Sequence, residues 1–126
     1  MIAADTSTWI VFLEGGAGED IEMLAKALGD RQVVMAPPVL TELLSDPELS
    51  SSAARTLCDV PLIEVEPGYW QRAGKLRARV LAQKRKARLG DALIAQSCMD
   101  ARVSLITRDR DFRAFAEAAA LDLMVG

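Results

Sequence analysis

The stretch Ile2-Ala3-Ala4-Asp5-Thr6-Ser7 decides how the rest of this chain is interpreted, because it places a carboxylate directly after a short apolar run. Such a run, followed by an amphipathic segment, is typical of a buried strand that leads into a helix. In α/β proteins, ligands bind beyond the carboxyl ends of the strands. Taken alone, Asp5 is most simply a helix cap, since Asp side chains accept hydrogen bonds from the free N–H groups of a first turn. Other acids at equivalent strand ends would change that interpretation.

Segments typical of strands alternate with segments typical of helices along the chain. The predicted strands cover residues 1–5, 32–36, 62–65, 103–107 and 121–125. The predicted helices cover residues 6–14, 20–28, 37–44, 48–58, 69–85, 91–101 and 112–120. This order predicts an α/β fold with a small parallel sheet of four to five strands flanked by helices. The length of 126 residues fits one domain, residues 1–126.

Composition excludes several classes of site. The chain has no histidine, which removes the Ser-His-Asp triad and histidine-ligated zinc. No apolar run reaches the length of about 18 residues that a membrane span needs, and no signal peptide is evident. The two cysteines, Cys58 and Cys98, are isolated in apolar helical patterns and are expected to be reduced packing residues. A cytoplasmic protein without a membrane partner is therefore expected.

Four further acids stand near predicted strand ends or helix starts. The residues three, four and seven positions after Asp91 in its predicted helix are all small or apolar, so they form an apolar face that begins at Asp91. A carboxylate on that face should point toward the sheet. Glu42 lies off the apolar stripe of its helix, where a solvated side chain is the simpler interpretation. Asp109 and Asp111 follow the fourth predicted strand, where a turn with a helix cap is the simpler interpretation.

Carboxylates that converge in one cleft repel each other and raise each other's pKa, so such a cluster needs a cation. Oxygen ligands without histidine or paired cysteines suit Mg²⁺ or Mn²⁺. These ions serve the hydrolysis of phosphodiesters, where they activate a water and neutralise the leaving oxygen.

A basic run precedes Asp91. Between residues 72 and 88 lie eight of the 15 Lys and Arg residues, and no acid occurs between Glu66 and Asp91. A solvated helix face explains such a run as well as a phosphate-binding surface does. The chain nevertheless has a net charge of −3 and would need a local positive surface to attract a polyanion. The residues predicted to contact RNA are Arg72, Lys75, Arg79, Lys84, Arg85, Lys86 and Arg88.

Four segments together resemble the PIN-domain family, and within it the VapC-type toxins of toxin–antitoxin pairs. The resemblance covers nearly the whole chain. Its landmarks are residues 5–7 (DTS), 40–44 (LTELL), 90–95 (GDALIA) and 105–112 (LITRDRDF). None of these segments is specific for the family by itself, but the four together, in this order and at these intervals, are specific for it.

The resemblance implies a Rossmann-like sheet and a Mg²⁺- or Mn²⁺-dependent endoribonuclease whose catalytic acids are Asp5, Glu42, Asp91 and Asp109. Asp5 and Asp91 would bind the metal directly. The residues expected to orient these carboxylates are Thr6, Ser7 and Thr107, and Asp111 is an alternative to Asp109. The resemblance also implies a homodimer, an RNA substrate and neutralisation by a cognate antitoxin protein.

Two alternatives remain at this point: a PIN fold that has lost activity and only binds a partner, and a phosphate-accepting regulatory α/β domain. The regulatory domain fits less well, because no lysine follows Lys86. If Asp5 binds metal, the cap of the first helix should pass to Thr6 and Ser7. Asp5→Asn would then abolish cleavage and leave the fold intact or more stable, because carboxylate repulsion is relieved.

Overall fold

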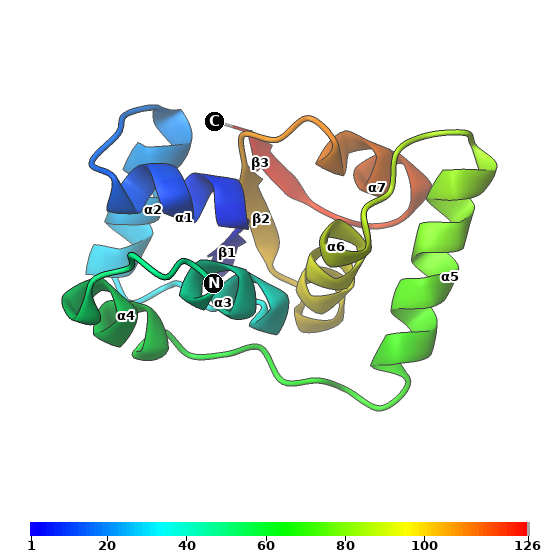
Figure 1. The fold of residues 1–126 in the computed structure, drawn as a ribbon. Helices are drawn as coiled ribbons and strands as arrows, with labels where there is room; N and C mark the ends of the chain where they lie inside the picture. The colour runs from blue at the N-terminus through cyan, green and yellow to red at the C-terminus, as the bar shows by residue number, and fades with distance from the viewer. Residues whose placement is uncertain (126) are drawn as a thin grey trace.

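A computed structural model of the protein describes residues 1–125, which form a small parallel sheet between two groups of helices (Figure 1). The order of elements is β1 (Ile2–Ala4), α1 (Thr6–Leu13), α2 (Glu19–Gly29), α3 (Pro37–Leu44), α4 (Ser51–Cys58), α5 (Tyr69–Ala82), α6 (Leu89–Ala101), β2 (Ser104–Thr107), α7 (Phe112–Ala118) and β3 (Leu123–Val125). The predicted α/β fold class is therefore confirmed.

The sheet has three strands in the order β1-β2-β3, all parallel. The predicted strands at 32–36 and 62–65 form only single parallel bridges, Ile2 with Val33 and Met35 with Leu62. Through these bridges, residues 32–36 lie beside β1 and residues 62–65 lie beside residues 32–36, as predicted, but neither segment forms a regular strand. Pro37 explains the shortness of the first segment, because it begins α3 directly after Ala36. Pro61, which has no N–H to donate, limits the second segment on its N-terminal side.

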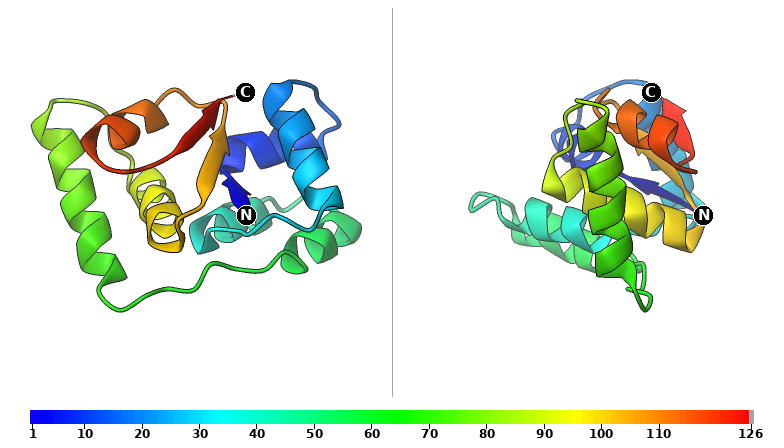
Figure 2. Two further views of the ribbon diagram at one scale, coloured as in Figure 1. Left: turned by 180° about the vertical axis from the view of Figure 1, so that it is seen from behind. Right: turned by 90° about the vertical axis from the view of Figure 1, so that its right-hand side faces the viewer.

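Helices cover both faces of the sheet, as parallel strands require. Helices α1 and α2 contact one side of the strands, while α6 contacts β2 and α7 contacts β3 on the other. Helix α5 packs over α6 and α7 and lies outermost, which is clear from behind and from the side (Figure 2). Helices α3 and α4 lie along one end of the sheet (Figure 1).

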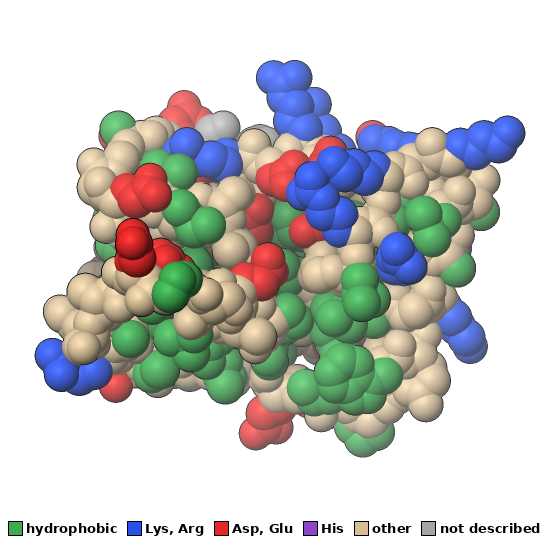
Figure 3. All heavy atoms as spheres, in the orientation of Figure 1, with side chains coloured by type: hydrophobic (Ala, Val, Ile, Leu, Met, Phe, Trp, Pro, Cys, Tyr) green, Lys and Arg blue, Asp and Glu red, His purple; other side chains and the backbone are tan. Residues whose placement is uncertain are grey.

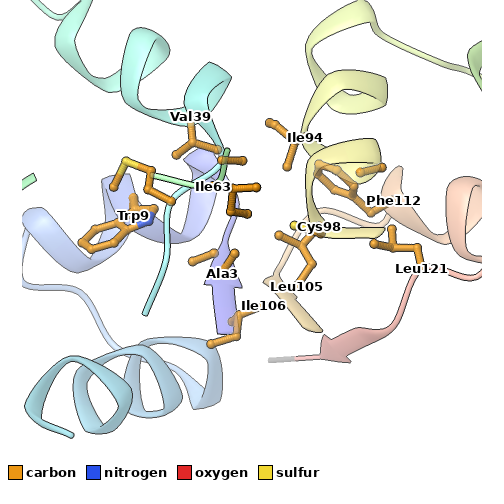
Figure 4. Close-up of a cluster of buried hydrophobic side chains, with 14 of the residues drawn as sticks. Ala3, Trp9, Val39, Ile63, Ile94, Cys98, Leu105, Ile106, Phe112 and Leu121 are labelled. Atoms are coloured by element: carbon orange, nitrogen blue, oxygen red, sulfur yellow. The ribbon is translucent and has the colours of Figure 1, made fainter. Parts of the chain in front are cut away.

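The core lies on both sides of β1 and β2 (Figure 4). Consecutive apolar residues are fully buried in both strands, Ala3 and Ala4 in β1 and Leu105 and Ile106 in β2, so neither strand centre alternates between apolar and polar residues. Trp9 of α1 fills one side, and Cys98 of α6 and Phe112 of α7 fill the other.

Several predicted boundaries and contacts differ from the structure. Helix α4 begins three residues later than expected, because the Ser50 side chain accepts a hydrogen bond from Ala53 N (3.0 Å) and caps it. Helix α5 ends at Ala82, and Lys84 adopts a left-handed φ of 58°. Cys98 packs in the core as predicted, whereas Cys58 is exposed. Within residues 1–125, no helix is both long enough and apolar enough to cross a membrane.

Candidate active site

The four acids predicted to be catalytic come together at the carboxyl ends of β1 and β2. Asp5 follows β1, Asp109 follows β2, Asp91 lies in the first turn of α6, and Glu42 reaches across from α3. They line a cleft of about 210 Å³. The complete lining is Asp5, Thr6, Ser7, Ile10, Glu42, Arg88, Asp91, Ile94, Asp109 and Phe112. Acidic side chains accordingly gather in the middle of the face shown in Figure 3, with Lys and Arg side chains beside them.

Asp5 is held by three hydrogen bonds and is only 2% exposed. Its Oδ2 accepts from Thr107 Oγ1 (2.7 Å) and Ser7 Oγ (2.8 Å), and its Oδ1 accepts from Thr8 N (3.0 Å). The last of these bonds makes Asp5 itself the cap of α1. The expectation that Thr6 and Ser7 take over the cap is therefore wrong, because one carboxylate oxygen can cap the helix while the other faces the hydroxyls of Ser7 and Thr107.

Asp91 is partly buried, and its Oδ2 has no hydrogen-bond partner anywhere in residues 1–125. Burial raises its pKa to about 6, and the nearby carboxylates of Asp109, Asp5 and Glu42 add to this rise, against the opposite effect of the Arg88 guanidinium. The sequence pattern predicted that this carboxylate points inward. A buried oxygen without a partner is a group that a bound cation would satisfy.

Asp109 and Asp111 both belong to the acidic cluster. The carboxylates of Asp91, Asp109 and Asp111 each offer an oxygen within 4.8 Å of the others. Thr107 Oγ1 accepts a hydrogen bond from Asp109 N (2.9 Å), and Asp109 Oδ1 accepts one from Asp111 N (2.9 Å). Thr107 therefore orients Asp5 and Asp109 with the same hydroxyl. Asp111 lies beside the cleft that Asp109 lines.

Glu42 is exposed, as its position off the apolar stripe predicted. Its Oε1 accepts a hydrogen bond from Thr6 Oγ1 (3.0 Å), which ties α3 to the start of α1 across the mouth of the cleft. Although the Glu42 side chain faces away from the apolar side of α3, it therefore lines the cleft at the start of α1.

Two basic residues reach the acids. Lys86 Nζ lies 3.4 Å from Asp111 Oδ2, and Arg88 Nη1 lies 3.8 Å from Asp109 Oδ2 and 3.9 Å from Asp111 Oδ2. Both basic side chains are more than half exposed, at 57% and 56%. Two exposed cations therefore lie at the edge of the acidic cluster.

The other basic residues do not form one continuous free surface. Arg72 Nη2 lies 2.5 Å from Asp100 Oδ2 on α6, and Arg85 pairs with Glu117 on α7. These pairs join α5 and the loop after it to neighbouring helices, so the predicted RNA-binding run is partly structural. The remaining predicted residues are exposed: Lys75, Arg79 and Lys84.

The donor set fits a hard divalent cation. Every candidate ligand is a carboxylate oxygen, and Asp91 Oδ2 is buried without a partner in the described residues. The carboxylates found within the span of one ion are those of Asp91, Asp109 and Asp111, a group that does not include the predicted ligand Asp5. Oxygen-only sites of this kind suit Mg²⁺ or Mn²⁺ better than zinc.

Sequence reasoning missed one pair beside the cleft. Arg108 donates two parallel hydrogen bonds to Asp20, Nε to Oδ2 and Nη2 to Oδ1, both at 2.8 Å. Thr8 Oγ1 donates a third to Asp20 Oδ2 (3.1 Å). In the sequence, Asp20 stood out only as the first residue of the predicted helix 20–28. The one available signal was the position of Arg108 between Thr107 and Asp109.

Comparison with known proteins places this geometry in a family. The family model for the PIN domain matches residues 2–118. A search of curated protein sequences finds no match.

Solved structures with the same fold include VapBC2 from Rickettsia felis bound to a promoter DNA fragment, with a TM-score of 0.74 and 17% identity over 100% of this chain and 99% of that chain. VapBC-5 from Mycobacterium tuberculosis has a TM-score of 0.73 and 20% identity over 99% and 98% of the two chains. FitAcB from Neisseria gonorrhoeae has a TM-score of 0.69 and 17% identity over 98% and 96%. At these identities the likeness shows a shared fold. The match of the family model over residues 2–118 shows that the chain belongs to the PIN domain family.

Proposed function

We propose that the protein is a metal-dependent endoribonuclease of the VapC type, a toxin that a cognate antitoxin neutralises. The observation that carries the proposal is the convergence of Asp5, Asp91 and Asp109 at two strand ends, with Asp91 Oδ2 buried and without a partner within the described chain. Carboxylates this close together repel one another, and a bound cation would relieve that repulsion. Membership of the PIN domain family supports a nuclease.

In this proposal some residues of the cleft bind the ion and others orient the residues that bind it. Asp5 and Asp91 are the direct ligands, with Asp109 completing the set and Asp111 beside it. When bound, Mg²⁺ or Mn²⁺ would supply an activated water and neutralise charge at the scissile phosphate. Glu42, at the mouth of the cleft, would help to hold the ion or a water there. Ser7, Thr6 and Thr107 keep the carboxylate oxygens aimed into the cleft through the bonds described above.

RNA is the proposed substrate, and Lys86 and Arg88 are its first contacts. Their exposed cations stand 3.4–3.9 Å from the acids and can bind phosphate oxygens that the carboxylates would otherwise repel. Lys75, Arg79 and Lys84 extend the positive surface along α5 and the following loop. Arg72 and Arg85 contribute less than the sequence suggested, because each is paired with an acid.

The proposed partners are a cognate antitoxin and a second copy of the chain, in the cytoplasm. The name of one neighbour supports the antitoxin, since VapBC-5 from Mycobacterium tuberculosis is a member of the VapBC family of toxin–antitoxin systems. Exposed apolar side chains support association with another protein. Trp70 and Leu89 are 64% and 62% exposed, and Trp70 lines an apolar hollow next to Glu42.

RNA cleavage by the purified chain tests the proposal. We expect cleavage with Mg²⁺ or Mn²⁺, none in excess chelator, and recovery when the ion is restored. Asp91→Asn should abolish it, whereas Asp59→Asn, which changes an exposed acid at the end of α4, should not. Cleavage that persists in chelator would overturn the proposal. A folded protein that binds the ion but cuts no cellular RNA would favour the partner-binding alternative.

A further inference from the structure

Asp20 and Arg108 form an ion pair that flanks the cleft without lining it. Asp20 is 1% exposed, and both of its oxygens are engaged by the guanidinium at 2.8 Å. The hydrogen bonds from Arg108 hold the pKa of the Asp20 carboxyl below its usual value, so the pair is ionised at neutral pH. Parallel bonds of this kind fix orientation as well as distance.

The local backbone is shaped around this pair. Gly18 has a φ of +145°, and a Cβ there would lie 2.6 Å from Asp20 Oδ1 and 2.9 Å from Arg108 Nη2. Arg108 Nη2 also donates to Ala17 O (3.2 Å). Asp20 is buried but the Arg108 side chain is 36% exposed, and an ion pair with one partner open to solvent contributes little net stability, because water screens the attraction. Its close fit to the α1–α2 connection therefore calls for a reason other than stability.

The pair is joined to the acidic cluster at two points. Arg108 stands between Thr107, which holds Asp5, and Asp109. Thr8 is the second link, because its N–H donates to Asp5 Oδ1 while its hydroxyl donates to Asp20 Oδ2. Any shift of the Thr107–Asp109 segment is thus resisted from the α1–α2 side of the molecule.

We propose that the Asp20–Arg108 pair is a positioning device that fixes residues 107–109 against the start of α1 and so sets the spacing of the Asp5 and Asp109 carboxylates for a divalent ion. The proposal rests on the metal centre of the proposed function. It assigns Asp20 and Arg108 no contact with the ion or the RNA.

The chain supplies a matched control. Arg72 forms a similar two-bond pair with Asp100, Nε to Oδ1 at 3.2 Å and Nη2 to Oδ2 at 2.5 Å. Asp100 lies near the end of α6, whereas Asp91 lies in its first turn. Asp100→Asn therefore breaks a comparable pair without touching the cleft.

The test measures Mn²⁺ affinity by calorimetry and amide hydrogen exchange in the absence of metal, at a temperature where every variant is folded. The variants are Asp20→Asn, Arg108→Lys, which keeps the charge but not the paired geometry, and Asp100→Asn. We expect the first two to weaken Mn²⁺ binding about tenfold or more, as loss of residues that support metal ligands does. Exchange should quicken in residues 107–111 of these two variants. Asp100→Asn should leave both measurements unchanged.

Two results would overturn the proposal: Asp20→Asn and Arg108→Lys proteins that bind Mn²⁺ as the parent does, or an equal weakening in Asp100→Asn, which would indicate a general loss of stability. If Asp20→Asn does not fold, Arg108→Lys decides. A parent protein that binds no Mn²⁺ would defeat the metal centre instead. The exchange comparison would then still show whether the pair fixes residues 107–111.

Discussion

Replacing Asp91 by Asn should stabilise the metal-free protein near neutral pH while destroying its ability to bind the ion. The rise in the pKa of Asp91 from 3.8 to about 6 means that its ionised form is disfavoured in the folded state. At about 1.4 kcal/mol per unit, keeping this carboxylate charged costs about 3 kcal/mol of folding free energy. Asparagine has nearly the same shape and carries no charge, so the variant escapes this cost.

The sign of the pH dependence follows from the direction of the shift. A group whose pKa is raised on folding binds extra protons in the folded state, so stability falls as pH rises from about 4 to about 6. The advantage of Asp91→Asn should therefore be about 3 kcal/mol at pH 7.5 and about 1 kcal/mol at pH 4.5. At still lower pH it should vanish, because Asp91 is then protonated in both states.

Urea unfolding in chelator, followed by circular dichroism at both pH values, measures this difference. Exposed Asp59→Asn is the control and should change stability little at either pH. Adding Mn²⁺ at pH 7.5 should then stabilise the parent and not the Asp91→Asn protein, because only a folded state that binds ligand gains from it. The account would be refuted by an Asp91→Asn protein no more stable than the parent at pH 7.5, or by one whose gain in unfolding free energy is as large at pH 4.5 as at pH 7.5. Either result would mean that burial and the nearby carboxylates do not raise the pKa of Asp91.

Three further substitutions test other parts of the site. Asp5→Asn should abolish metal binding and also lower stability by about 1–3 kcal/mol, because one amide oxygen cannot accept the three hydrogen bonds that the Asp5 carboxylate accepts. A variant that is more stable than the parent in chelator would instead show that relief of carboxylate repulsion outweighs the lost hydrogen bonds. Thr107→Val leaves Asp109 N without a partner and Asp5 Oδ2 with only the hydrogen bond from Ser7 Oγ. Both Mn²⁺ affinity and urea stability should therefore fall, the latter by about 1–3 kcal/mol. Arg88→Gln should reduce by about 1 the slope of a plot of log RNA-binding constant against log salt concentration. It should also slow cleavage more than Lys75→Gln does, because Arg88 lies beside the acids. Equal effects of the two substitutions would show that nearness to the acids does not matter.

The sequence predicted those features that depend on local pattern. Asp91 stands at the head of an apolar stripe, and this alone indicated a carboxylate turned toward the sheet. The strand-like runs before Asp5 and Asp109 placed both acids at one edge, because parallel strands end on the same side. Only their convergence could change the interpretation of Asp5, which as a single residue is a helix cap and remains one in the structure.

Pairings between distant segments could not be predicted in the same way. Arg72 and Arg85 belong to a basic run, yet their partners Asp100 and Glu117 come from other helices, and nothing near them in sequence indicates this. Likewise, Asp20 finds its partner 88 positions away. The predicted strand at 32–36 shortened to a bridge because Pro37 starts α3 at once.

The hydrogen bond between Thr107 and Asp5 joins residues 102 positions apart. One half of the cleft therefore leaves the ribosome long before the other. The nascent chain cannot assemble the acidic cluster until β2 and residues 107–111 have emerged and paired with β1. Contacts this distant in sequence also form slowly. The order of synthesis thus keeps the growing chain without a complete site, which opens an interval in which a partner protein can be in place before the cleft is complete.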